Sequence, residues 1–122
     1  MLAVLAAIPL SPFSMTLHDA GSNLFVFEFA RQSADYCEGK GFPVRGQYHA
    51  WMRENGHLQG KSIDAIGTES KENGLSQAEI GKIMANSDAF IRQKAESLIK
   101  EQDVPCGKFQ AMIDKFSAYL KK

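Results

Sequence analysis

The chain has no excess of charge of either sign, because 14 Lys and Arg residues balance 14 Asp and Glu residues. This balance excludes a domain that holds nucleic acid or anionic lipid by net charge alone. Cysteine is also scarce, and two cysteines cannot build a Cys-only zinc site. The longest apolar run, Met1–Leu10, is about half as long as a membrane-spanning helix requires. We therefore predict no membrane span.

The chain also lacks the residue patterns of common catalytic and metal sites. Its three histidines, His18, His49 and His57, form no H-E-x-x-H pattern, and neither C-x-x-C-H nor G-x-S-x-G occurs. Gly39 and Gly41 stand two apart, but they lack the preceding strand and following helix of a phosphate-binding loop. We therefore predict no metal, no cofactor and no enzymatic activity.

The first twenty residues have two interpretations. The apolar run Met1–Leu10 and the stretch with small residues up to Ala20 are typical of a secretory signal remnant, with cleavage after Ala20. No Lys or Arg precedes the run, and His18 stands where a small residue is usual. The alternative is an N-terminal arm packed on the domain. Both interpretations leave residues 21–122 as the helical domain.

Helical spacing of apolar residues dominates the rest of the chain. The pattern predicts helices over about 22–38, 46–55, 62–73, 76–102 and 105–120. The glycines Gly56 and Gly60 are expected to break the chain between the second and third of these segments. Apolar residues make up 44% of the chain and charged residues 23%, which are ordinary globular values. We predict an all-α, single-domain bundle of four or five helices.

The clearest helix start lies at Ser76. Ser76 and Glu79 have the spacing of a capping box, in which the Ser hydroxyl and the Glu carboxylate each accept a hydrogen bond from the other residue's backbone amide. Leu75 and Ile80 flank the cap as a hydrophobic staple. These four residues predict a helix that begins directly after Ser76.

The two cysteines fall at the ends of predicted helices. Cys37 lies at the end of the first helix and Cys106 in the opening turn of the last, each on the apolar stripe. Two antiparallel helices would bring these ends together, which predicts a structural disulfide and favours an oxidising compartment. Buried free thiols and a reactive thiol near a helix N-terminus are the alternatives.

The connection Gly39–Trp51 is the predicted partner-binding segment. Aromatic residues and Arg anchor many protein interfaces. This glycine-rich stretch contains several aromatic residues and one Arg. The alternative is that the aromatic residues of this stretch fill the core of the bundle. The candidate partner-binding residues are Phe42, Arg45, Tyr48, His49 and Trp51.

Residues 74–98 resemble a helix-turn-helix motif, with a turn at Ala85–Ser87 and a recognition helix over Asp88–Leu98. The resemblance implies DNA binding. It departs from the motif at Asn86 and Lys94, where apolar residues are usual, and the recognition helix has no net positive charge. A single amphipathic helix is the alternative, and periodicity does not distinguish the two.

The sequence favours a small exported helical protein, periplasmic or secreted, that acts by binding another protein. An inhibitor, an immunity protein or an accessory factor fits this description. If residues 1–20 are not a signal, the protein is expected in the cytoplasm. A cytoplasmic location is also what the DNA-binding interpretation requires. A third reading is a carrier of an apolar ligand held by aromatic and methionine side chains, namely Phe25, Phe27, Phe29, Met52, Met84, Phe90, Phe109, Met112 and Phe116.

Overall fold

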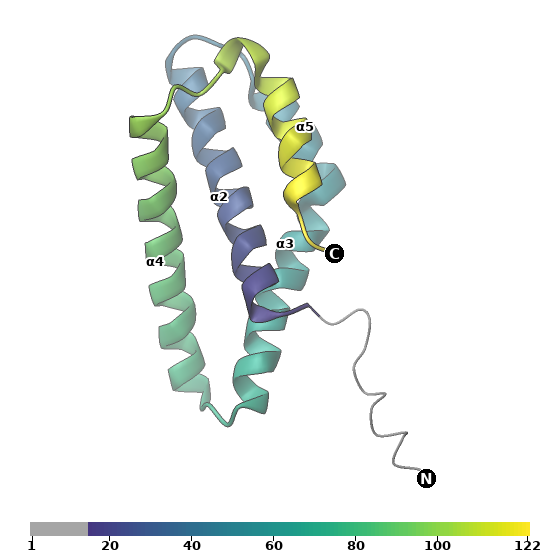
Figure 1. Ribbon diagram of the computed structural model, residues 1–122, viewed down its shortest axis with the longest axis vertical. Helices are drawn as coiled ribbons and strands as arrows, with labels where there is room; N and C mark the ends of the chain where they lie inside the picture. The colour runs from purple at the N-terminus through teal and green to yellow at the C-terminus, as the bar shows by residue number, and fades with distance from the viewer. Residues whose placement is uncertain (1–14) are drawn as a thin grey trace.

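The computed structural model describes residues 15–122, and these fold into four α-helices (Figure 1). This confirms the predicted all-α bundle. Residues 1–14, with the signal and arm interpretations placed on them, lie outside the described residues. The helices are α2 (Leu17–Gly39), α3 (Arg45–Glu72), α4 (Gln77–Glu101) and α5 (Phe109–Tyr119), and the short 3-10 turn η1 (Cys106–Lys108) precedes α5.

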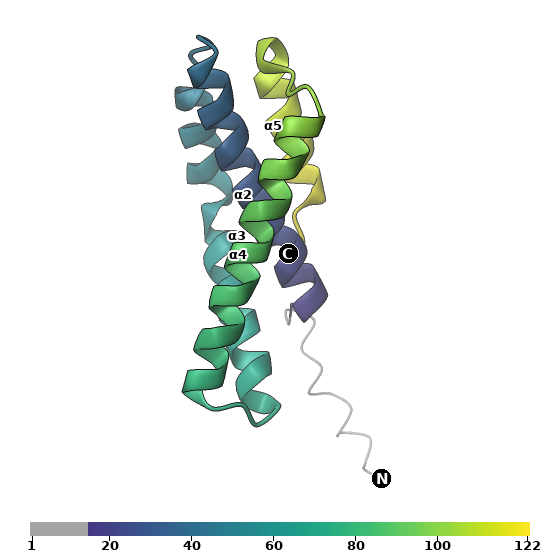
Figure 2. The ribbon, with the colours of Figure 1, turned by 90° about the vertical axis from the view of Figure 1, so that its left-hand side faces the viewer.

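Helix α2 is the central element and packs against each of the other three helices. In Figure 1, α4 lies on one side of α2 and α5 on the other, with α3 behind. Figure 2 shows that α2 and α4 are inclined in opposite directions, so the two helices cross. Helix α4 packs mainly on α2 and less on α3, and within residues 15–122 most of its surface stays exposed.

Helix α2 begins at Leu17 rather than near residue 22. The hydroxyl of Thr16 accepts a hydrogen bond from the Asp19 amide at 3.0 Å and caps the helix. Ala20 is fully buried and Met15 is 8% exposed, so both are packed parts of the domain. The predicted boundary after residue 20 therefore falls inside α2, and a cut there would remove the first turn of the helix.

Helix α3 continues through Gly56 and Gly60, so the predicted break is wrong. A glycine inside a helix costs about 1 kcal/mol relative to alanine. Against that cost, Trp51, Leu58 and Ile66 lie on one face of α3 and are all buried. Burying a large apolar side chain contributes about 1.5–3 kcal/mol, so packing outweighs the local cost of the two glycines.

Helix α4 begins as predicted and continues further than the helix-turn-helix reading allows. The capping box at Ser76 and Glu79 is confirmed, with the Ser76 amide donating to Glu79 Oε1 at 2.8 Å. The turn predicted at Ala85–Ser87 is absent, because α4 is unbroken there. No Gly or Pro interrupts these residues, and Met84 and Ile91 on either side both face the bundle. The two-helix geometry of a helix-turn-helix is therefore missing from residues 74–98.

The predicted disulfide between Cys37 and Cys106 is present. The two sulfur atoms lie 2.04 Å apart and the two Cα atoms 5.4 Å apart, within the range of a protein disulfide. Cys37 is in the last turn of α2 and Cys106 opens η1, so the bond fastens the start of the C-terminal helical segment to the central helix. Both cysteines are bonded, which excludes the free-thiol and reactive-thiol alternatives.

The main core lies between α2, α3 and α5. Its largest fully buried side chains include Phe27 from α2 and Phe109 and Ile113 from α5. Trp51 of α3 packs against Phe27, with 5.3 Å between the ring centroids. A smaller cluster at the other end of α2 contains Met15, Ala20 and Ile66 and receives Met84 from α4. Helix α4 contributes one fully buried side chain, Ala95, and thus covers the bundle with a largely exposed surface.

The buried amide of Asn23 fastens the end of the chain to α2. Its Nδ2 donates to the carbonyl of Lys121 at 2.9 Å and to Ser62 Oγ at 3.0 Å. Its Oδ1 accepts from the Lys121 amide at 2.7 Å. Leu120, just before this contact, is 6% exposed. A single side chain therefore joins α2, α3 and the segment that follows α5.

Candidate functional site

The predicted partner-binding residues differ in how far the fold exposes them. Trp51 is 4% exposed, and its Nε1 donates to Ser117 Oγ at 2.8 Å, so it belongs to the core as the alternative reading states. Phe42 is 40% exposed and Arg45 and His49 are exposed. Tyr48 is half-buried, and burial raises its pKa. Four of the five residues are thus at least partly accessible to a partner, whereas the Trp51 side chain is buried in the core.

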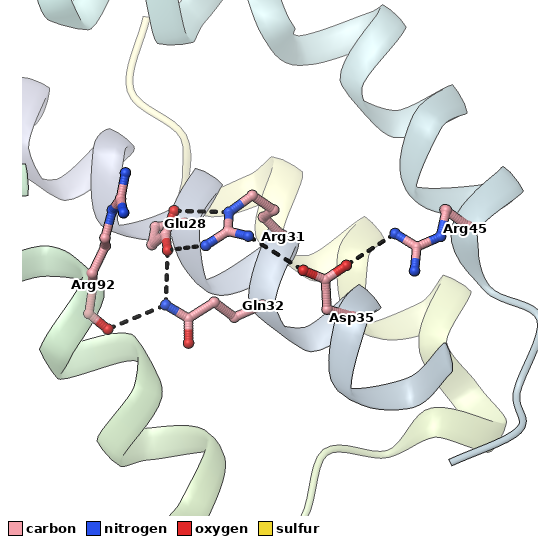
Figure 3. Close-up of polar contacts among 6 residues, drawn as sticks. All are labelled: Glu28, Arg31, Gln32, Asp35, Arg45 and Arg92. Carbon is pink, nitrogen blue, oxygen red and sulfur yellow. Dashed lines mark hydrogen bonds and ion pairs between the residues drawn. The ribbon is translucent and has the colours of Figure 1, made fainter. Parts of the chain in front are cut away.

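Arg45 belongs instead to a network of ion pairs on the surface of the bundle (Figure 3). Asp35 lies between Arg45, at 2.9 Å, and Arg31, at 3.2 Å. Arg31 also pairs with Glu28, and Gln32 donates both to Glu28 and to the backbone carbonyl of Arg92 in α4. The network links α2, the start of α3 and α4. Its carboxylates are all paired, which makes it a set of helix-to-helix contacts rather than a reactive centre.

Glu28 is the most enclosed carboxylate of this network, with its side chain 15% exposed. Partial burial raises the pKa of Glu28, but hydrogen bonds from Arg31 and Gln32 outweigh burial and leave that pKa below its ordinary value. The hydrogen bond to Glu28 in turn raises the pKa of Arg31. The charged forms of both groups are therefore favoured by the fold.

The lowered pKa of Glu28 predicts a pH-dependent contribution to stability. The contribution is complete above the unfolded-state pKa near 4.5 and is lost as the pH falls through the lower folded-state pKa. The wild type should therefore be more stable than Glu28→Gln at pH 7, and the difference should shrink as the pH falls below 4.5. Urea unfolding of both proteins across this pH range measures it. A difference that does not change as the pH falls below 4.5 would contradict this assignment.

An apolar groove lies between the N-terminal half of α2 and the middle of α4, two helices that run side by side in Figure 1. We call it the α2–α4 groove. Its volume is about 750 Å³. Three of its side chains are large, apolar and well exposed: Phe90 at 64%, Leu17 at 43% and Ile83 at 37%. The lining residues are Leu17, His18, Gly21, Ser22, Phe25, Ile66, Ile83, Asn86, Ser87, Phe90, Ile91 and Lys94.

Phe25 lines the α2–α4 groove, and a row of aromatic side chains continues from it along α2 and onto α5. Phe25 stacks on Phe29 with 5.7 Å between the ring centroids, and Phe29 packs on Phe116 of α5 at 5.6 Å. The ammonium of Lys94 lies 5.7 Å from the centroid of Phe25. Phe25 thus lies between its neighbour on α2 and a cation from α4.

Two aromatic residues of the groove, Phe25 and Phe90, are predicted from the sequence to hold an apolar ligand. The structure divides the ligand set, because Phe27, Phe109 and Phe116 lie in the core while Phe90 is exposed. Phe90 falls outside the stripe formed by Ile80, Met84, Ser87 and Ile91. That displaced large apolar residue was the available signal for an exposed binding face.

Neither a metal centre nor a membrane segment is found in the part of the chain that the structure describes. Within residues 15–122, no group of three or more His, Cys, Asp or Glu side chains could hold a metal ion. His18, His49 and His57 are exposed and lie on α2 or on α3. None of the described helices is both long enough and apolar enough to cross a bilayer.

The fold and the groove define the class of protein, a disulfide-linked four-helix bundle with an open apolar groove on one face. The chain matches no protein-family model, and no similar curated protein or solved structure is found. A function for this chain is therefore argued from its own residues.

Proposed function

We propose that this chain is a small exported helical protein that acts by binding another protein, and that the α2–α4 groove is its binding surface. An inhibitor, an immunity protein or an accessory factor would act in this way. The carrying observation is the exposed apolar rim of the groove. Leu17, Ile83 and Phe90 stand in water around an apolar floor, and large apolar groups gathered on one exposed face mark protein interaction sites.

The open shape of the groove favours a protein over a small apolar ligand. A site for a small molecule encloses most of the ligand's surface. Here the three large rim side chains remain exposed, so a small occupant would leave them in water. A partner surface covers floor and rim together, and Phe90 would be its anchor, because aromatic side chains carry much of the energy of protein interfaces.

The disulfide supports the exported location in this proposal. Cytosolic proteins of ordinary organisms keep their thiols reduced, whereas periplasmic and secreted proteins retain such bonds. Removal of a signal segment would then occur before Met15, because Met15 and Ala20 are packed against Ile66. Fractionation of the cells, followed by the intact mass of the purified chain, tests both points. A cytoplasmic protein, or a chain that begins at residue 21, would contradict them.

Binding at the groove is tested with one substitution that fills it and a matched one that does not. A Cβ at Gly21 would meet nothing within 4 Å, so Gly21→Leu is tolerated by α2 and places its side chain in the groove. Gly60→Leu makes the same change on the exposed side of α3, again with open space around it. Both changes favour the helix over glycine, so we expect both proteins to keep the fold, which helical circular dichroism checks.

A photo-crosslinker in place of Phe90 should join the chain to its partner in the cells that make it, and the same group in place of exposed Arg53 on α3 should not. The partner is identified by mass, purified and titrated. We expect Gly21→Leu to weaken binding by about 30-fold or more, since a blocked anchor costs about 2 kcal/mol. Gly60→Leu should bind like the wild type. Equal binding by the wild type and Gly21→Leu would refute the groove as the surface.

A further inference from the structure

The α2–α4 groove has a one-sided charge in a chain that is neutral overall. Its lining includes a cation, Lys94, and an imidazole, His18, but no Asp or Glu. The chain as a whole balances 14 basic against 14 acidic residues, so the lack of carboxylates is a local property of the groove lining. Lys94 takes part in none of the ion pairs found within residues 15–122. Its ammonium is held over the Phe25 ring instead.

The groove is also long enough to hold an α-helix of about three turns. Its wall on α4 runs from Ile83 to Lys94, eleven positions that span about 16 Å, or three helical turns. Ile83 and Phe90 stand seven positions apart on that wall and thus lie on one side of α4. On α2, the small residues Gly21 and Ser22 lie between Leu17 and Phe25. Because Gly21 and Ser22 are small, a third helix could approach α2 closely. It would lie in the groove between the larger side chains of α2 and those of α4.

From this geometry we infer that the groove binds an amphipathic helix of the partner protein, with Asp or Glu at the edge of its apolar face next to Lys94. This inference rests on the proposed function and names the chemistry of the partner. The apolar face of the helix would cover Phe25, Ile83 and Phe90. A carboxylate would pair with the exposed Lys94 ammonium and complement the positive charge of the groove.

A second copy of this chain is a poorer occupant on electrostatic grounds. A two-fold symmetric contact places the same patch on both sides. Lys94 of one copy would then face groove residues of the other that include no carboxylate. Like charges without a counter-charge oppose association. A partner that supplies its own carboxylates satisfies the same face at no such cost.

The probe is a pair of 14-residue peptides designed as amphipathic helices with identical leucine faces. One carries Glu and the other Lys along the edges of that face. Each is titrated into the isotope-labelled full chain, and shifts of backbone amide signals map where it binds. We expect the Glu peptide to perturb the amides of Gly21, Phe25 and Phe90 and to bind about tenfold more tightly than the Lys peptide. The preference should shrink at high salt, because exposed charges are screened.

A charge reversal at Lys94 tests the assigned pair. Lys94→Glu should abolish or invert the preference for the Glu peptide, while Lys82→Glu on the same helix should keep it. Lys82 is exposed and does not line the groove. Lys82→Glu changes the net charge of the chain by the same amount as Lys94→Glu, but away from the groove. Gly21→Leu should weaken both peptides. These three variants separate the local pair from the total charge and from the fit of the apolar face.

Each alternative occupant gives a different result. Equal binding of the two peptides, still blocked by Gly21→Leu, overturns the acidic-helix inference and leaves the proposed function intact. A fatty acid such as laurate that binds one-to-one in the groove, where neither peptide binds, overturns the inference and the proposed function together. A dimer in light scattering that Phe90→Glu converts to a monomer assigns the groove to a second copy and also overturns the inference.

Discussion

Replacing Cys37 and Cys106 together with alanine is expected to lower the free energy of unfolding by about 4 kcal/mol. The bond joins residues 69 positions apart, and a crosslink across a loop of that length removes a large amount of conformational freedom from the unfolded chain. All of α3 and α4 lie within the loop. A whole domain of this size is typically stable by about 5–15 kcal/mol, so the loss is a large share of the total.

Urea unfolding followed by helical circular dichroism measures this effect. Three samples are compared: the oxidised wild type, the wild type reduced with a phosphine, and the double alanine variant. The reduced wild type should resemble the variant, apart from the packing contribution of two buried sulfur atoms. Equal unfolding free energies for the oxidised and reduced wild type would show that the bond does not stabilise this fold.

The disulfide was predictable because it depends on two local patterns and one topological expectation. Each cysteine lies on the apolar stripe of a helix, and each stands at a helix end. Antiparallel packing of neighbouring helices then brings these ends together. The start of α4 was predictable for a related reason. Ser76 and Glu79 interact within one helical turn, so no tertiary contact was needed to recognise their capping box.

Helix α3 was not predictable in the same way, because its continuity is decided by contacts distant in sequence. Gly56 and Gly60 are local signals for a break, and they are correctly read as unfavourable within a helix. The opposing term is the burial of Trp51 and Leu58 against α2 and α5. The stabilisation from this burial depends on which helices pack together, and hence on the fold itself. The local sequence shows the free-energy cost of the two glycines but not the packing that compensates for it.

The α2–α4 groove was missed for a third reason. Periodicity assigns apolar residues to a buried side, but it does not tell how much of that side a neighbouring helix covers. Helix α4 crosses α2 and packs little on α3, so its apolar surface exceeds the area that is covered. Ile83 and Phe90 lie in the uncovered part. The crossing of the two helices, rather than the composition of either one, creates the exposed face.

The beginning of α2 shows how one residue can have several plausible roles. Thr16, Ser22 and Asn23 are all good helix-capping residues, and sequence alone does not choose among them. In the structure Thr16 caps the helix, which leaves Asn23 one full turn and more inside it. There the side chain of Asn23 is fully buried. An amide in that position must find hydrogen-bonding partners, and it finds them in two segments remote in sequence.

Replacing Asn23 with alanine is therefore expected to cost about 3 kcal/mol of unfolding free energy. The change removes the hydrogen bonds with both backbone groups of Lys121 and with Ser62 Oγ. A buried polar group left without its partner costs about 1–3 kcal/mol. The carbonyl and amide of Lys121 must then turn to water, which draws the segment around Leu120 away from the core.

A matched change at Asn55 serves as the control. Its side chain donates to the Trp51 carbonyl at 3.0 Å, but the residue is only half-buried. Asn55→Ala should therefore cost less than about 1 kcal/mol, because water can replace the lost contact. Urea unfolding compares the two variants, and amide hydrogen exchange locates the effect. In Asn23→Ala the Lys121 amide should lose its protection while the amides of α4 keep theirs. Retained protection at Lys121 would show that burial of Leu120, and not the Asn23 amide, holds the end of the chain in place.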